Sequence, residues 1–453
     1  MASQKKPNLV FIVPDEFRAQ AMGFRREDPV ITPNMNALAG ESLAFHRAYS
    51  NSPVCSPYRG ILFTGKYPYE NGVITNCNSA SPDCYLREDA LCLSDILSRN
   101  GYRCGYIGKW HLEHPREKDY PYLPPRRADG KIWDAYTPRE RRHGFDFWHS
   151  YGCCDNHFEP HYWESDEDVK DCIHVKQWAP EHETDVAVEY IQNADASKPF
   201  ALFLAHNPPH MPFEMVPDKY LELYKDKSPE ELLNRPNVRE NHTAAESVQQ
   251  YFAAISGLDE QLGRVLKAID EKGIRDDTIV VYTSDHGEMM GSHGLMHKNV
   301  YYDEAFQVPL LIRYPGKILP RETDMLISTI DLMPTLLTVM GLKEAIPGDI
   351  RGKNAGEEIL QNRDGNIPFA IYHHTYRSRG FTDGKYTFVV HHEKDDMALP
   401  MEAVLFDNEA DPFQMDDLAP RNPELVREFC GRLLEMLTEC ADPFAETVRK
   451  FRG

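Results

Sequence analysis

The sequence predicts an α/β fold: a large, mainly parallel sheet covered by helices on both faces, followed by a smaller antiparallel α+β subdomain. Short continuous apolar runs, typical of buried parallel strands, alternate with longer amphipathic segments typical of helices. Beyond about residue 345 this alternation gives way to short strand-like runs separated by turns. We therefore divide the chain into residues 1–345, which form the α/β domain, and residues 346–453, which form the C-terminal subdomain.

The predicted elements of the first domain follow one another in strand-to-helix order. The strands are residues 8–13, 102–107, 200–205, 278–283 and 310–313, and the helices are residues 32–38, 93–99, 183–193, 247–270 and 328–340. Residues 113–180 are rich in Pro, His, aromatic and charged residues and show little periodicity. We interpret them as a long insertion near the mouth of a site, where specificity would lie.

The C-terminal subdomain is predicted from short apolar runs and a final helix. The strands are residues 367–372, 380–381, 385–391 and 404–407, with the turn Asp383-Gly384 between two of them. Residues 425–440 form an amphipathic helix that closes the chain.

Composition excludes some classes of function. The net charge of −21, from 50 basic and 71 acidic residues, argues against nucleic acid as a partner, because a phosphate-binding surface is basic. No apolar run is long enough for a membrane span, and the apolar run before Pro14 is too short for a signal peptide. The expectation is a cytoplasmic protein, or an exported one whose leader is missing from this sequence. Most of the ten cysteines are expected to be free thiols.

Polar residues gather where the predicted strands end. Each has an ordinary alternative explanation, such as a helix cap, a core histidine or a solvated surface lysine. Parallel strands, however, bring their carboxyl ends to one edge of the sheet, where ligands collect in α/β proteins. The residues that follow strands are Asp15, Glu16, Lys109, His111, His210, Asp285 and His286, and loops add Cys55, Arg59 and Lys298.

The run Cys55-Ser56-Pro57-Tyr58-Arg59 is the strongest local candidate for a nucleophile site. With Pro57 in the first turn of a helix, Cys55 and Arg59 would share one face. The helix N-terminus would offer N–H groups to an anion. The alternative is a buried structural cysteine beside a surface arginine.

Asp15, Glu16, Asp285 and His286 together form a candidate metal site. Hard oxygen donors suit calcium or magnesium better than zinc, although the imidazole leaves the identity of the metal open. A pair of helix caps would explain the same residues.

Several of these motifs resemble one family. CSPYRG is similar to the signature of the sulfatases, and TPNMNALAGESLAFHRAYSNSPVCSPYRG resembles their N-terminal run. PDEF, GKWH, HNPPHMPF, SDHGE and GSHGLMHKN match further family positions, as does LFDNEADPFQMDDLA near the C-terminus. The resemblance covers most of residues 7–340 and implies an alkaline-phosphatase-like fold and hydrolysis of a sulfate monoester, with a sulfated small molecule or saccharide as substrate.

The resemblance also implies roles for individual residues. Cys55 would be oxidised to formylglycine by a formylglycine-generating or anaerobic maturation enzyme. Asp15, Glu16, Cys55, Asp285 and His286 would bind a divalent cation, with Ca²⁺ as the default. Glu16 stands where the family pattern usually has the second residue of an Asp-Asp pair. Arg59, Lys109 and Lys298 would bind sulfate oxygens, and His111 and His210 would move protons.

In the implied mechanism, formylglycine is hydrated to a gem-diol, and the metal and Arg59 help to hold one hydroxyl ionised. That oxygen attacks sulfur, and the alcohol leaves with a proton from His210 or Lys298. His111 then deprotonates the second hydroxyl, so that sulfate is expelled and the aldehyde reforms.

Three alternatives stay open. The first is a phosphonate monoester or phosphodiester hydrolase of the same superfamily, the second a noncatalytic anion-binding protein with an unmodified Cys55, and the third a hydrolase that uses the thiolate itself. Aromatic and basic residues could form a pocket for a sulfated carbohydrate. A solvated loop with scattered aromatic residues explains the same residues equally well. Candidate pocket residues are His157, His161, Trp163, His174, Trp178, His373, His374, Arg377 and Arg379.

Overall fold

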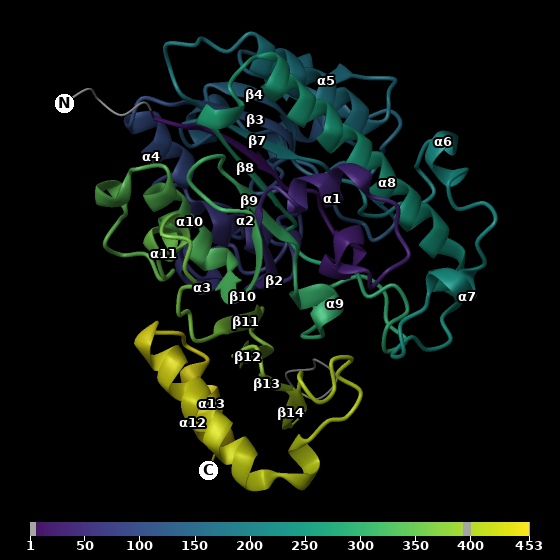
Figure 1. The fold of residues 1–453 in the computed structure, drawn as a ribbon, viewed down its shortest axis with the longest axis vertical. Helices are drawn as coiled ribbons and strands as arrows, with labels where there is room; N and C mark the ends of the chain where they lie inside the picture. The colour runs from purple at the N-terminus through teal and green to yellow at the C-terminus, as the bar shows by residue number, and fades with distance from the viewer. Residues whose placement is uncertain (1–5, 393–399, 453) are drawn as a thin grey trace.

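The computed structural model describes residues 6–392 and 400–452 (Figure 1). A ten-stranded sheet runs through the larger part of these residues in the order β10-β2-β9-β8-β1-β7-β3-β4-β5-β6. The strands are β1 (Asn8–Ile12), β2 (Leu43–Tyr49), β3 (Arg103–Lys109), β4 (Phe147–Tyr151), β5 (His161–Glu164), β6 (Ile173–His174), β7 (Phe200–Ala205), β8 (Thr278–Thr283), β9 (Leu310–Arg313) and β10 (Arg321–Ser328).

The centre of the sheet is parallel. Strand β1 pairs in parallel with β7 and β8, and β3 pairs in parallel with β7 and β4. Because these strands point the same way, the loops after β1, β3, β7 and β8 leave the sheet at one edge. Strand β9 is antiparallel to both of its neighbours, and β5 and β6 continue the far end in antiparallel fashion.

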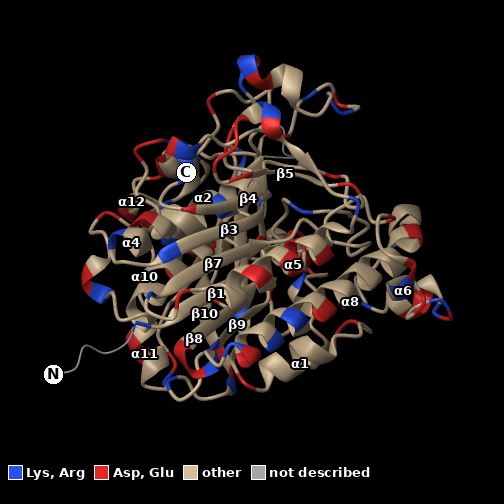
Figure 2. Cartoon of the chain, turned by 90° about the horizontal axis from the view of Figure 1, so that it is seen from above, with Lys and Arg blue, Asp and Glu red and all other residues tan. Residues whose placement is uncertain are grey.

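Helices cover both faces of the sheet, as the sequence predicts. Alternate side chains of β1 enter two different cores: Leu9 and Phe11 pack on one face, and Val10 and Ile12 on the other. Figure 2 shows α1, α5 and α8 on one side of the strands and α2, α4 and α10 on the other, with the charged residues mostly outside the tan strands. The buried strands therefore have few polar side chains except at their ends.

The helices of the larger part differ widely in length. Helix α8 is the longest, and the Asn241 side chain accepts a hydrogen bond from Ala244 N at its start. The helices are α1 (Pro33–Ala39), α2 (Cys55–Thr64), α3 (Pro68–Asn71), α4 (Leu93–Arg99), α5 (Ala179–Gln192), α6 (Asp218–Leu221), α7 (Pro229–Leu232), α8 (His242–Glu271), α9 (Asp303–Phe306), α10 (Thr329–Val339) and α11 (Gly356–Leu360).

A second, four-stranded antiparallel sheet lies beyond α11, as predicted. Its strands follow chain order and are β11 (Ala370–His374), β12 (Ser378–Thr382), β13 (Tyr386–His392) and β14 (Met401–Asp407). Helices α12 (Pro423–Glu439) and α13 (Ala445–Arg452) lie beside it in Figure 1. Phe381, Phe388 and Phe429 join the sheet to α12 in one core. The domain boundary at residue 345 stays a prediction.

The small sheet contacts the loop that precedes α2. His373 N donates to Asn51 O at 2.7 Å, and the Asn51 side chain donates to Ile371 O at 2.8 Å. Asn51 also accepts from Ile330 N at 2.9 Å. Because Asn51 is four residues before Cys55, the C-terminal sheet helps to fix the approach to α2.

Residues 113–180, which show little periodicity in the sequence, contain strands that were not predicted. This segment contains β4 and β5 and the short β6, which extend the main sheet beyond β3. Strands β2 and β10 were also missed, because the half-exposed His46 and Arg47 interrupt the apolar run of β2. The predicted strand at residues 310–313 is antiparallel to its neighbours in the otherwise mainly parallel sheet.

Two predictions from composition can be compared with the structure. All ten cysteines, which lie in the described part of the chain, are free thiols. Across residues 6–392 and 400–452, none of the helices combines the length and apolar character that a bilayer crossing requires.

Candidate active site

Helix α2 begins at Cys55, so the thiol lies at the positive end of a buried helix. Val54 precedes it with extended backbone. Pro57 lies in the first turn, where backbone N–H groups have no acceptor within the helix, so the missing N–H of proline costs no helical hydrogen bond. Gly65 ends the helix with a φ of 63°. All residues of α2 are buried, which holds Cys55 in one position.

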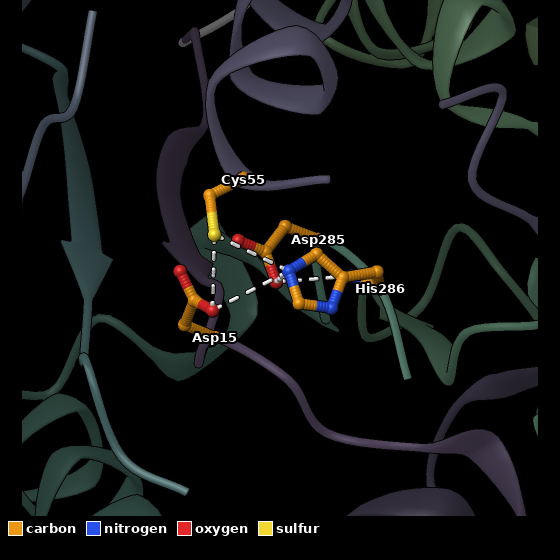
Figure 3. A group of neighbouring side chains, drawn as sticks. All are labelled: Asp15, Cys55, Asp285 and His286. Atoms are coloured by element: carbon orange, nitrogen blue, oxygen red, sulfur yellow. Dashed lines mark hydrogen bonds and ion pairs between the residues drawn. The ribbon is translucent and has the colours of Figure 1, made fainter. Parts of the chain in front are cut away.

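Three strand ends meet at this helix. Asp15 follows β1, Lys109 ends β3, and Asp285 and His286 follow β8. The Cys55 Sγ atom lies 3.5 Å from Asp15 Oδ1 and 3.4 Å from His286 Nε2 (Figure 3). Residues predicted from separate motifs therefore converge on the thiol.

In both Asp15 and Asp285, one carboxylate oxygen faces cationic side chains and the other faces His286. Arg59 Nη2 lies 3.2 Å from Oδ2 of both Asp15 and Asp285, and Lys109 Nζ lies 2.7 Å from Asp15 Oδ2. The Oδ1 atoms lie on the side of His286, at 3.5 Å and 3.6 Å from its Nε2. Arg59 and Lys109 thus balance part of the negative charge. The Oδ1 atom of each carboxylate remains available to a cation.

This donor set fits a divalent cation. Ligand atoms of Asp15, Cys55, Asp285 and His286 all lie within 4.8 Å of one another and are buried. Burial and the nearby Asp15 raise the pKa of Asp285 to about 7, so a cation beside the two carboxyls would favour the ionised form of Asp285. His286 Nδ1 lies 3.0 Å from Gly287 O, so Nδ1 donates and Nε2 can present a lone pair.

Glu16 lies outside this group of four but forms an adjoining candidate metal group with Asp15 and His210, and its role as a metal ligand stays a prediction. Its backbone adopts a left-handed conformation with φ of 67°, and its N–H donates to Asp285 Oδ1 at 3.0 Å. Its carboxylate lies 3.1 Å from Lys298 Nζ and 3.4 Å from His210 Nε2. The extra methylene of Glu carries the carboxylate past the central group and toward Glu288.

Cationic side chains favour an anion at position 55. Burial and Asp15 raise the pKa of the Cys55 thiol, but Lys109, Lys298 and His286 outweigh them and hold it well below its usual range. Lys109 Nζ lies 3.7 Å from the sulfur. Although the whole chain carries a charge of −21, this pocket is locally suited to negative charge.

The two predicted proton-transfer histidines have different surroundings. His111 Nε2 lies 3.1 Å from Cys77 O; burial lowers the pKa of His111, but the Cys153 thiol outweighs this and raises it to about 9. Burial and Lys298 lower the pKa of His210. One imidazole is thus biased toward its charged form and the other toward its neutral form.

Three of the proposed substrate contacts in residues 113–180 are buried. Trp163 is 1% exposed and Trp178 is 3% exposed, and both pack in apolar cores. His157 is 2% exposed. A saccharide could not stack on these three side chains. His161 pairs with Asp134 at 2.5 Å, but it lines a cavity of about 730 Å³ together with the exposed His174.

The C-terminal candidates also have internal partners. The His373 ring stacks on Tyr67 at 4.5 Å, and Arg379 forms an ion pair with Asp442 at 2.7 Å. Both are buried, so neither supports a direct contact with substrate. Arg377 is exposed in the turn between β11 and β12.

His374 acts on the site indirectly. Its Nε2 atom accepts from the Asn299 side chain at 2.7 Å, and Asn299 follows Lys298 with a left-handed φ of 73°. Asn299 N also donates to Pro53 O at 3.1 Å. The loop that carries Lys298 is therefore fixed between the C-terminal sheet and the residues before α2.

Sequence reasoning missed three residues that the structure brings to the site. Asn207 accepts from Lys109 Nζ at 2.9 Å, and its place directly after β7 was a usable signal. Cys153 approaches His111, and the Trp133 ring lies 6.2 Å from the His111 ring. Nothing in the local pattern distinguishes Trp133 from the buried tryptophans.

Comparison with known proteins identifies the family. The model of the sulfatase family matches residues 7–342, which include every residue of the central group. The chain belongs to the sulfatase family. A second model, described as the C-terminal region of N-sulphoglucosamine sulphohydrolase, matches residues 291–439.

Individual relatives agree with this assignment. The sulfatase is 39% identical to the endo-4-O-sulfatase of Bacteroides thetaiotaomicron, over 97% of this chain and 93% of that protein. It is 34% identical to the ulvan-active sulfatase of Formosa agariphila, over 97% and 82%. A solved B. thetaiotaomicron 4S-sulfatase, from work on the metabolism of multiple glycosaminoglycans, superposes with a TM-score of 0.93 at 37% identity, covering 99% of both chains.

Proposed function

We propose that this sulfatase hydrolyses a sulfate monoester of a carbohydrate, with Cys55 converted to formylglycine and Ca²⁺ as its resident cation. The observation that carries the proposal is the buried convergence of Cys55, two carboxylates, His286 and Lys109 at one sheet edge. The carbohydrate substrate is supported by the relatives, which are named as an endo-4-O-sulfatase and an ulvan-active sulfatase.

The proposed cation and formylglycine would supply positive charge and a nucleophile, respectively. A divalent cation held by Asp15, Asp285 and His286 would supply positive charge beside position 55. Hydrated formylglycine would supply a hydroxyl nucleophile and a second hydroxyl through which the product can be released. Oxygen donors dominate the proposed ligands, which favours Ca²⁺ or Mg²⁺ over softer metals.

The side chains of this protein bind and orient the sulfate. Lys109 is held by Asp15 and Asn207, and Lys298 by Glu16, so both ammonium groups are positioned before substrate arrives. Preorganised cations of this kind stabilise charge that builds up on the non-bridging oxygens during reaction.

The two histidines are suited to proton transfer at different atoms. His210 Nε2 lies 3.4 Å from the Glu16 carboxylate, and it would give a proton to the leaving alcohol only from the charged ring. Because burial and Lys298 lower the pKa of His210, Lys298 is the alternative donor of this proton. His111 donates from Nε2 to Cys77 O, so its Nδ1 atom remains to exchange a proton with the group at position 55.

The test compares two ester classes on enzyme co-expressed with a maturation enzyme. We expect release of sulfate from 4-nitrophenyl sulfate or a sulfated saccharide, and loss of that activity in Cys55→Ala. Preferential cleavage of a phosphonate monoester or phosphodiester would replace this proposal with the hydrolase alternative. No turnover of either class, with Cys55 unmodified, would favour the noncatalytic alternative.

A further inference from the structure

Trp133 lies beside the catalytic residues but outside the group described above. Its ring centroid is 6.2 Å from that of His111, and the indole is partly exposed. By contrast, Trp163 and Trp178 are buried in apolar cores. Among the tryptophans of the insertion, Trp133 therefore combines proximity to a catalytic histidine with access to solvent.

The residues on both sides of Trp133 are fixed. Ile132 N donates to Ser79 Oγ, and Ser79 N donates to Ile132 O, each at 2.9 Å. On the other side, Asp134 accepts from Cys153 N at 2.9 Å. Ile132 and Asp134 are 5% and 2% exposed. The indole is thus presented by an anchored backbone, which lowers the entropy cost of binding a ligand against it.

Two cations border the indole. The Arg127 guanidinium and Lys131 Nζ each lie 5.3 Å from the ring centroid. They are brought together by a tight turn in which Arg127 N donates to Lys131 O at 2.9 Å, with Gly130 at a φ of 78°. Their side chains remain 33% and 39% exposed.

The two cations are held to different degrees. Arg127 pairs with Asp155 at 2.7 Å and donates to Cys153 O at 3.2 Å, so its guanidinium is fixed in place. Lys131 lies 3.6 Å from Asp129 in a solvent-exposed pair, which contributes only about 0–1 kcal/mol. An incoming carboxylate or sulfate can therefore take over Lys131 at little cost and meets Arg127 already positioned.

We propose that Trp133, Arg127 and Lys131 form a subsite for an acidic sugar residue adjacent to the sugar that carries the scissile sulfate. The two cations over the indole bind the carboxylate or sulfate group, and the exposed part of the indole contacts the sugar ring. The inference rests on the proposed function and narrows its substrate class to anionic oligosaccharides or polysaccharides.

The test uses one ester in two contexts. The substrates are a 4-O-sulfated hexosamine monosaccharide and a tetrasaccharide in which uronate residues flank the same sulfated hexosamine. We expect wild-type kcat/KM to be higher for the tetrasaccharide. Trp133→Ala and the double variant Arg127→Ala/Lys131→Ala should each reduce the tetrasaccharide-to-monosaccharide ratio of kcat/KM at least tenfold.

Matched variants separate binding from general damage. Trp133→Phe, which keeps an aromatic ring, should restore part of the ratio, and Lys267→Ala, at an exposed lysine of α8, should leave it unchanged. A carboxyl-reduced tetrasaccharide distinguishes recognition of the carboxylate from recognition of a second sulfate. Calorimetry with the turnover-deficient Cys55→Ala protein should show a matching rise in Kd for the tetrasaccharide in the Trp133→Ala background.

The possible failures are distinguishable. An unchanged ratio in Trp133→Ala and in the double variant would overturn the subsite and leave the proposed function intact. A wild-type enzyme that prefers the monosaccharide would do the same. Absence of sulfate release from the tetrasaccharide, the monosaccharide and 4-nitrophenyl sulfate would instead overturn the proposed function.

Discussion

Asp285 provides a quantitative test of the proposed cation site. Burial and Asp15 raise its pKa from 3.8 to about 7. A carboxyl whose folded-state pKa is raised stabilises the fold below its unfolded pKa and loses that stability as the pH rises through the folded pKa. At about 1.4 kcal/mol for each pKa unit, the ionised carboxylate costs the metal-free fold about 4 kcal/mol above pH 7.

The substitution Asp285→Asn removes this charge with little change in shape. In chelator-treated protein at pH 8, we expect the variant to be more stable than the wild type, by up to about 4 kcal/mol. The wild type should lose this stability between about pH 4 and pH 8, while the variant changes less. Urea denaturation at pH 5 and pH 8 measures the difference.

Adding Ca²⁺ should make the wild type more stable than Asp285→Asn. Ca²⁺ relieves repulsion between the two carboxylates, so it should raise the urea midpoint of the wild type at pH 8 far more than that of Asp285→Asn. The reasoning would be refuted by wild-type and variant proteins that respond alike to pH and to Ca²⁺.

Three further predictions follow from individual contacts. Lys109→Ala should lower kcat/KM for the sulfate ester about 10²–10³-fold, as removal of a preorganised charge donor does; a change below tenfold in steady-state kinetics would contradict this. His374→Ala should lower kcat/KM by about fivefold through the Lys298 loop, and Asn299→Ala should add little to it, because one hydrogen bond of about 1 kcal/mol joins them; additive losses would argue against this coupling. His161→Ala should destabilise the fold by about 3 kcal/mol near neutral pH, because Asp134 loses its buried partner. Since Asp134 raises the pKa of His161 well above its usual range, the difference in urea midpoint should shrink only at higher pH, and a constant difference would contradict the assignment.

The central strands were predictable because burial on both faces demands continuous apolar sequence. Strands β7, β8 and β9 begin and end at the predicted residues. The direction of β9 was not predictable, because an apolar run of four residues carries no information on its pairing partner. Strand β2 was not predicted for another reason. Its half-exposed His46 and Arg47 are typical of a loop, and only the pairing of β2 with β9 and β10 shows that they lie in a strand.

The site residues, like the strands, were predictable where their position in the sheet determines their place. Residues at strand ends, such as Asp15 and Asp285, were identifiable because the edge of a parallel sheet collects them. Glu16 was assigned from the resemblance of PDEF to the family motif, and its left-handed backbone and longer side chain place the carboxylate beside Lys298 and His210, at the border of the central group. Trp133 and Trp163 could not be distinguished, since their burial depends on long-range packing within residues 113–180.

Catalysis through a modified Cys55 can be measured on samples matured to different extents. Peptide mass spectrometry gives the fraction of Cys55 converted to formylglycine, and ion chromatography gives the rate of sulfate release. We expect the rate to rise in proportion to the converted fraction and to extrapolate to zero for unmodified protein. A rate of sulfate release that does not depend on the converted fraction would rule out formylglycine as the nucleophile.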